Sequence, residues 1–117
     1  MREILFKGYN KETQRWYEGM LGKFDNKYYI DIGTGTKVYV EEESVSQYTG
    51  FTDINGKKIF EEDVLHWNED WYGYALMING RWMIVSEGPS VDDYYLNELA
   101  NKVEVINNSY EERLKSA

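Results

Sequence analysis

Residues 47–65 read QYTGFTDINGKKIFEEDVL and contain the clearest local structural signal in the chain. Its centre is the pair Asn55-Gly56, with residues on both sides that can be extended. Asn-Gly supplies the positive φ that a type I′ turn requires, and the twist of that turn matches the twist of paired strands. The stretch therefore predicts a β-hairpin.

A second Asn-Gly pair, Asn79-Gly80, lies between two apolar segments, residues 71–78 and 81–86. The same turn chemistry applies here, and the flanking segments are longer and richer in strand-forming residues. We therefore expect a second hairpin, with positive φ in both Asn-Gly pairs.

Further short apolar segments alternate with polar turns along the rest of the chain. Tyr28, Ile30 and Ile32, for example, recur with the two-residue period of a strand. The pattern predicts strands at residues 3–9, 15–21, 28–32, 37–40, 64–67 and 103–106, with turns at 10–13, 25–27 and 33–36.

One helix is expected near residues 90–100. Ser90 is a suitable N-cap, and Asp92 and Asp93 follow it where a helix N-terminus favours negative charge. Tyr95, Leu96 and Leu99 then stand at helical spacing. After the strand at 103–106, Asn107 and Asn108 are expected to turn the chain into a polar tail.

These elements together predict a mainly β fold: successive antiparallel hairpins forming a small barrel-like domain with one short helix. The chain has 117 residues, which suits a single domain (1–117) with the last few residues as a disordered tail. Nineteen aromatic residues, eleven of them tyrosine, suit pleated, half-buried surfaces.

Composition also limits the function. There is no cysteine, which excludes disulfides, thiol nucleophiles and thiolate metal sites. The net charge of −8 disfavours contact with phosphate backbones and anionic lipid. Because charges occur within the first seven residues, we expect no secretory signal, and we predict a cytoplasmic protein with no membrane partner.

No set of residues in the sequence forms a recognisable catalytic or metal-binding motif. His66 is the only histidine and lies in a predicted strand, where a structural role is the commoner one. Residues 61–63 and 68–70 are carboxylate clusters without EF-hand spacing, and we interpret both as solubility devices. Residues 41–43 are interpreted as a solvated element end or helical turn.

Two further motifs have structural explanations. Residues 33–37, GTGTK, share residue types with a phosphate loop but lack its spacing. For Tyr48 and Phe51 we favour core packing over ligand stacking. We therefore predict no catalytic residue, no cofactor and no metal.

Three separated parts of the chain resemble the YopX family of small phage and prophage proteins: residues 2–7 with 10–13, positions within 47–59, and residues 96–99 with 105–111. The resemblance implies a mainly β, barrel-like fold and an origin in a phage or prophage of a bacterial host. It carries over no catalytic residue. The positions that carry the family motif are Gln47, Tyr48, Thr49, Gly50, Asp53, Asn55, Gly56, Lys57, Ile59, Glu61 and Asp63.

The chain departs from the family pattern at two positions. Glu62 stands where the family usually has glycine, so we do not expect a backbone there that only glycine adopts. Asn107 also replaces a usual glycine, but asparagine tolerates left-handed geometry, so we expect the same turn at that position.

Three functions remain open. The first is a non-enzymatic module that binds a host or phage protein or a second copy of itself. The second is a nucleic-acid-related regulator or an acidic DNA mimic, although direct nucleic-acid binding is not expected at this net charge. The third is a small hydrolase using a carboxylate pair.

Overall fold

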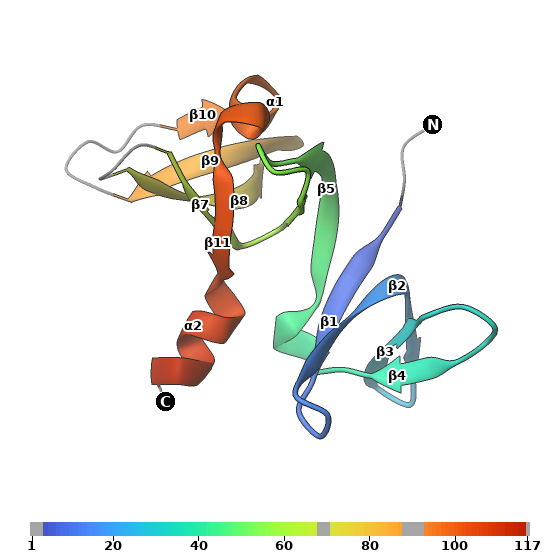
Figure 1. The fold of residues 1–117 in the computed structure, drawn as a ribbon. Coiled ribbons are helices and arrows are strands. Elements are labelled where there is room, and N and C mark those ends of the chain that lie inside the picture. Colours follow the sequence, from blue (N-terminus) through green and yellow to red (C-terminus); the bar gives the residue numbers. More distant parts are fainter. Residues whose placement is uncertain (1–3, 68–70, 88–92, 117) are drawn as a thin grey trace. The chain divides into compact units, whose positions relative to one another are not determined.

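The computed structural model describes residues 4–67, 71–87 and 93–116 (Figure 1). The chain divides into two compact units, residues 1–48 and 49–117, here called the N-terminal and C-terminal units. Strand β5 crosses this division.

The N-terminal unit is an antiparallel sheet in the order β4-β3-β2-β1-β5. Its elements are β1 (Phe6–Asn10), β2 (Arg15–Phe24), β3 (Lys27–Asp31), β4 (Lys37–Tyr39), the 3₁₀ turn η1 (Glu42–Ser44) and the first residues of β5 (Ser46–Thr52). The predicted strands and turns of this region are confirmed, with boundaries shifted by a few residues.

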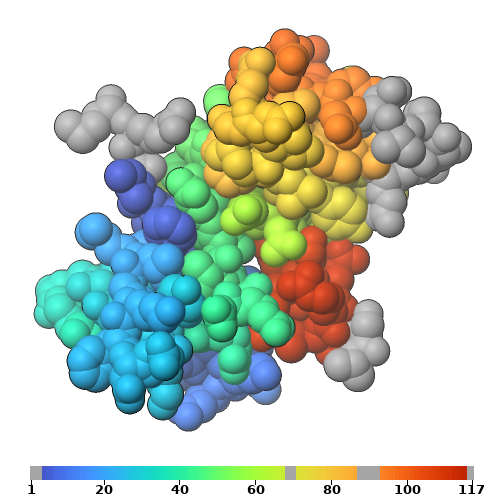
Figure 2. Space-filling model, turned by 180° about the vertical axis from the view of Figure 1, so that it is seen from behind, coloured from blue at the N-terminus to red at the C-terminus, as the bar shows by residue number. Residues whose placement is uncertain are grey.

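The two faces of this sheet differ in burial. Leu21, Ile30 and Val38 are directly opposite one another in β2, β3 and β4, and Ile30 is fully buried. On the opposite face Met20 and Phe24 are 67% and 65% exposed. The β2–β3 hairpin accordingly forms part of the surface in Figure 2 (light blue).

The β2–β3 turn shows why residues 25–27 were predicted correctly. Asp25 and Asn26 have φ values of 52° and 62°, as a two-residue type I′ turn requires. Short polar side chains tolerate this left-handed geometry better than others do.

The C-terminal unit contains a five-stranded antiparallel sheet in the order β10-β9-β8-β7-β11. Its strands are β7 (Asp63–His66), β8 (Tyr72–Ile78), β9 (Arg81–Glu87), β10 (Asp93–Tyr95) and β11 (Glu104–Asn108). Strand β6 (Lys58–Phe60) pairs with β5, and the helical segments are α1 (Leu96–Leu99), η2 (Ala100–Lys102) and α2 (Ser109–Ser116).

The core of the C-terminal unit lies on one face of this sheet. Its buried members are Ile59, Leu65, Ala75, Ile84, Leu96, Ala100, Val103 and Val105. Trp67, Trp71 and Tyr94 pack against this cluster. Their rings also meet one another edge to face, with centroids 5.5–6.5 Å apart. Burying one Leu or Ile side chain contributes about 1.5–3 kcal/mol, so this cluster is a main source of stability.

The mainly β class is confirmed, and so is the hairpin at Asn79-Gly80. Asn79 has φ 50° and Gly80 has φ 80°, and the turn joins the fully paired strands β8 and β9. The described strands form open sheets with edges, so the predicted barrel-like closure is not seen among them.

The short helix predicted near residues 90–100 is confirmed from Leu96 onward, and its predicted start is wrong at residues 93–95. Residues 90–92, including the predicted cap Ser90 and Asp92, lie outside the described residues. Residues 93–95 form strand β10, because they pair with Met83, Ile84 and Val85 of β9. Only Leu96–Leu99 is α-helical, and a 3₁₀ turn follows it.

The end of the chain also differs from expectation. Asn107 and Asn108 belong to β11, and α2 follows directly at Ser109. Asn107 does not have a positive φ, so the left-handed turn expected there is wrong. A register shift between Val105 and Asn107 in the pairing with β7 takes its place.

No helix among the described residues is long and apolar enough to cross a membrane.

Candidate functional site

The family-motif positions begin in β5, where they are structural. Gln47 is opposite Phe6 of β1, and the Tyr48 N–H donates to the Leu5 carbonyl at 2.8 Å. Tyr48 is buried, and Phe51 packs against the core of the C-terminal unit. Core packing of both rings, predicted from the sequence, is confirmed.

Thr49 and Gly50 fix the path of β5. The Thr49 hydroxyl donates to the Ile59 carbonyl at 2.7 Å and accepts the Phe51 N–H at 3.2 Å. Gly50 has φ 90°, a conformation that glycine adopts without steric cost.

Asp53 is the centre of the motif. Its carboxylate is 5% exposed and accepts three backbone N–H groups. Oδ1 accepts from Asn55 and Lys57 at 2.9 and 2.8 Å, and Oδ2 accepts from Val105 at 2.9 Å. Asp53 therefore shapes the turn and also ties it to β11, which lies 52 positions later in the sequence.

The turn at Asn55-Gly56 is a hairpin turn, but not of the expected type. Gly56 has φ 80°, whereas Asn55 is not among the residues of positive φ. The Gly56 N–H donates to the Asp53 carbonyl, and the Asp53 N–H to the Lys57 carbonyl. This is the pattern of an unprimed turn followed by a glycine bulge, so the predicted type I′ geometry is wrong here.

Asp63 has a similar role in the turn that follows β6. It is 1% exposed, so its interpretation as a solubility device is wrong. Oδ2 accepts the Phe60 N–H at 2.7 Å, and Oδ1 accepts from Asn108 Nδ2 at 3.0 Å. The Asn108 side chain in turn accepts the Tyr110 N–H at 2.9 Å, next to the start of α2.

Glu62 has a left-handed backbone although it stands where the family usually has glycine, and this region is uncommon for other residues but not restricted to glycine. It has φ 67°. Its N–H donates to the Ala75 carbonyl at 2.7 Å, and its carbonyl accepts both the N–H and the hydroxyl of Ser109. These contacts hold the unfavourable conformation without a glycine.

The motif carboxylates are thus occupied by the protein itself. Asp53 and Asp63 are turned toward backbone donors, which leaves little capacity for a substrate or cation. Within the described ranges no three His, Asp or Glu residues gather as a metal site would require. His66 is half-buried with its ring 5.0 Å from that of Tyr72, and residues 68–70 lie outside the described residues.

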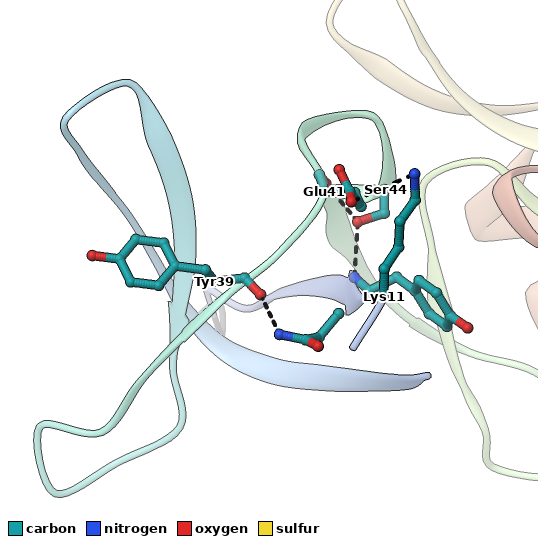
Figure 3. A network of polar contacts seen from close by, with 6 residues as sticks. Lys11, Tyr39, Glu41 and Ser44 are labelled. Carbon is teal, nitrogen blue, oxygen red and sulfur yellow. Dashed lines mark hydrogen bonds and ion pairs between the residues drawn. The ribbon is translucent and has the colours of Figure 1, made fainter. Parts of the chain in front are cut away.

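The acidic run at 41–43 is confirmed as an element end, because Glu42 opens the 3₁₀ turn η1. The Ser44 hydroxyl in this turn accepts the Tyr9 N–H at 2.8 Å and donates to the Glu41 carbonyl at 2.6 Å. The Glu41 N–H donates back to the Tyr9 carbonyl at 2.9 Å. Figure 3 shows how Glu41 and Ser44 fasten the chain after β4 to β1.

An open groove of about 730 Å³ lies next to these contacts between η1 and β1, within the N-terminal unit. It is lined by residues 10–13, Tyr17, 26–28 and 37–42. Within this lining Lys11 pairs with Glu41 at 3.6 Å, and the Asn10 side chain donates to the Tyr39 carbonyl at 2.8 Å. Sequence reasoning identified 10–13 and 25–27 only as turns, and no short motif marks the groove.

A smaller cavity of about 460 Å³ lies in the C-terminal unit. Its lining combines the apolar Val64 and Ile106 with Tyr72, Tyr74 and the polar Asn107. It contains one carboxylate, Glu112 of α2, and no basic group.

The comparisons with known proteins agree with the resemblance seen in the sequence. No curated protein matches the chain. A family model described as YopX protein matches residues 5–114, which includes every motif position discussed above and spans both compact units. This chain belongs to the YopX protein family.

Proposed function

We propose that the chain is a non-enzymatic protein-interaction module and that its partner binds in the groove of the N-terminal unit. The observation that carries the proposal is the groove itself, about 730 Å³ in volume and lined by three tyrosines, Tyr17, Tyr28 and Tyr39. Tyrosine gives large contact area at low entropic cost, and it is enriched among interface anchors.

The charge of the groove supports a polypeptide partner. Its lining carries three lysines, Lys11, Lys27 and Lys37, and three glutamates, Glu12, Glu41 and Glu42. A phosphate backbone gains affinity mainly where cations outnumber anions, which is not the case here. Balanced charges suit the mixed polar and apolar groups of a protein surface.

Membership of the YopX family suggests the setting. We propose a phage or prophage origin and action in the cytoplasm of a bacterial host, where the partner is a host or phage protein.

A second candidate, an acidic DNA mimic, is favoured by the distribution of charge. The sequence from residue 49 onward has thirteen acidic and six basic residues, whereas residues 1–48 have eight and seven. Nearly the whole net charge therefore belongs to the C-terminal unit. A mimic would bind a DNA-binding protein through that unit and leave the groove empty. The third candidate, a carboxylate hydrolase, loses support because Asp53 and Asp63 are engaged by backbone donors.

A photo-crosslinking experiment tests the proposal. A benzophenone amino acid replaces Lys27, which is exposed in the groove, or Lys102, an exposed control position in the C-terminal unit. Both proteins are irradiated in host lysate with and without nuclease. We expect position 27 to give a discrete protein adduct that survives nuclease treatment. Position 102 should give no adduct of the same mass.

Three results would contradict it. Adducts that disappear on nuclease treatment would favour nucleic acid, and an adduct only from position 102 would favour the acidic unit. Identical adduct patterns from both positions would show that the groove is not selective.

A further inference from the structure

We propose that the free edge of β4 pairs with an extended segment of the partner, which adds a strand to the N-terminal sheet within the groove. This proposal rests on the proposed function and names its mode of recognition. Main-chain pairing along an exposed edge is a recurrent way of binding peptides, with side-chain pockets adding specificity.

The pairing of β3 with β4 determines which backbone groups are free. The Val40 N–H donates to the Tyr28 carbonyl, and the Ile32 N–H to the Thr36 carbonyl. Hydrogen-bonded and non-bonded pairs alternate in an antiparallel ladder, so the pairs 29–39 and 31–37 are non-bonded. The N–H and C=O groups of Lys37 and Tyr39 therefore point away from β3.

One of these four groups is already used. The Tyr39 carbonyl accepts a hydrogen bond from the Asn10 side-chain amide, drawn as a dashed line at Tyr39 in Figure 3. The N–H and C=O of Lys37 and the N–H of Tyr39 have no hydrogen-bond partner among the described residues. Three unpaired groups along an edge are a template for another strand.

The groove is the gap where β4 and β1 diverge. Shortly after β4, the Glu41 N–H donates a hydrogen bond to the Tyr9 carbonyl of β1, so the two backbones are in contact there. At Tyr39, among the described residues, β4 is linked to β1 only through the Asn10 side chain. Beyond Asn10 the chain turns away through residues 11–14, closed by the Gln14 N–H to the Asn10 carbonyl. The edge at Lys37 and Tyr39 consequently faces open space and not a neighbouring strand.

The groove restricts the occupant. A strand beside β4 would place alternate side chains toward the half-buried Tyr17 and Tyr28. Since the lining charges are balanced, the segment needs no net charge. It cannot have proline where its N–H must meet the Lys37 carbonyl. We therefore infer an extended segment without net charge and with an apolar side chain at every second position.

The probe for this proposal is a displayed library of random peptides of about 12 residues, long enough for a strand of ordinary length. Enriched peptides are synthesised and titrated against the full chain. Each is then N-methylated at one position at a time. We expect methylation to weaken binding most at the one residue whose N–H meets the Lys37 carbonyl and to leave its two neighbours unaffected, because only alternate N–H groups face β4 and the Tyr39 carbonyl already accepts the Asn10 amide.

A pair of variants separates the backbone from the ring. Tyr39→Ala removes the ring and keeps the N–H, whereas Tyr39→Pro removes both. The Tyr39 N–H makes no bond to β3, so proline at this edge spares the ladder. We expect Tyr39→Pro to bind peptide about fivefold more weakly than Tyr39→Ala, as the loss of one main-chain hydrogen bond predicts.

Several outcomes would overturn strand addition. These are a library without enriched peptides, an N-methyl scan in which no single residue is sensitive or in which adjacent residues are equally sensitive, and equal binding by both Tyr39 variants. A dimer in light scattering that Tyr39→Pro dissociates would assign the edge to a second copy of the chain. Competition by single-stranded RNA would assign the groove to nucleic acid. If position 27 still crosslinks to a protein in any of these cases, the interaction module stands and only its mode fails.

Discussion

Glu62 illustrates how a single residue can hold a conformation that its side chain disfavours. Its φ of 67° is in the left-handed region, which costs a non-glycine residue about 1–2 kcal/mol. Three hydrogen bonds from its backbone groups, to Ala75 and Ser109, offset that cost. The tertiary contacts override the local preference.

We therefore expect Glu62→Gly to raise the free energy of unfolding by about 1 kcal/mol, by relieving the strain at positive φ. Urea denaturation followed by tryptophan fluorescence measures this, since Trp67, Trp71 and Trp82 all belong to the C-terminal unit. Glu61→Gly is the control and should be destabilising, because Glu61 does not have a positive φ. A loss of stability in Glu62→Gly would show that the side chain contributes more than the strain costs.

Asp53 carries a larger share of the stability. In Asp53→Asn one oxygen becomes an NH₂ group, and in either amide orientation a donor then faces a backbone N–H. We expect a loss of about 2–3 kcal/mol, the scale of a hydrogen bond to a charged group. The control is Asp31→Asn. Among the described residues the Asp31 carboxylate accepts only the Gly33 N–H, at an exposed turn, and an amide oxygen can also accept it. Equal losses in both variants would argue against a special role for Asp53.

The roles of these motif residues were only partly predictable. Asn55-Gly56 marks a turn through local chemistry, and the sequence indicated it correctly. The burial of Asp53 and Asp63 depends on Val105 and Asn108, which are 52 and 45 positions away. A carboxylate that caps distant backbone groups has no local signature, so Asp63 was taken for a surface residue.

At the scale of elements, the two Asn-Gly hairpins test how turn chemistry sets the register. Gly80 has φ 80° in a turn between strands paired along seven positions. We expect Gly80→Val to cost about 1–3 kcal/mol, because a β-branched residue is strained at positive φ. Gly80→Asn is the matched control and should cost less, since asparagine tolerates this region. Thermal denaturation compares the two, and equal melting temperatures would contradict this explanation.

Helices were predicted less well than strands for a physical reason. Tyr94 and Tyr95 lie at positions compatible with both periods, and their pairing with β9 decides in favour of a strand. Arg81 also stacks on the Tyr95 ring, 3.9 Å from its centroid, which fixes β10 against the start of β9. Helix α2 was missed because its sequence, SYEERLKS, is polar and has a weak apolar pattern. Its start is set by Ser109 and Asn108 through contacts with residues 62 and 63.

The whole molecule has its charge unevenly divided between its two units. Residues 1–48 carry eight acidic and seven basic residues, and the remainder carries thirteen and six. The net charge of −8 is therefore not evenly distributed along the chain. Nucleic-acid binding must accordingly be considered for each unit separately.

In the C-terminal unit the surplus carboxylates repel phosphates, and this repulsion becomes longer in range as salt is lowered. The N-terminal unit is nearly neutral and has exposed aromatic residues, so stacking of about 1–3 kcal/mol per base is the remaining attraction. Lys7 and Lys37 already lie over the rings of Trp16 and Tyr29, at 4.6 and 5.1 Å. Two lysines engaged in this way leave few cations to neutralise phosphates.

We accordingly expect no saturable micromolar binding of duplex DNA, single-stranded DNA or RNA at about 50 mM salt, where phosphate-driven affinity is exaggerated. Fluorescence anisotropy of labelled oligonucleotides measures it. A charge-reversal variant, Glu18→Lys with Asp31→Lys, serves as the positive control, because it adds two cations beside the aromatic rings of β2 and β3. Binding by this variant alone would show that the assay detects contact with this face and that the native carboxylates prevent it. Saturable binding by the native chain would show that aromatic stacking overcomes the missing positive charge, and the partner class proposed for the groove would then have to change.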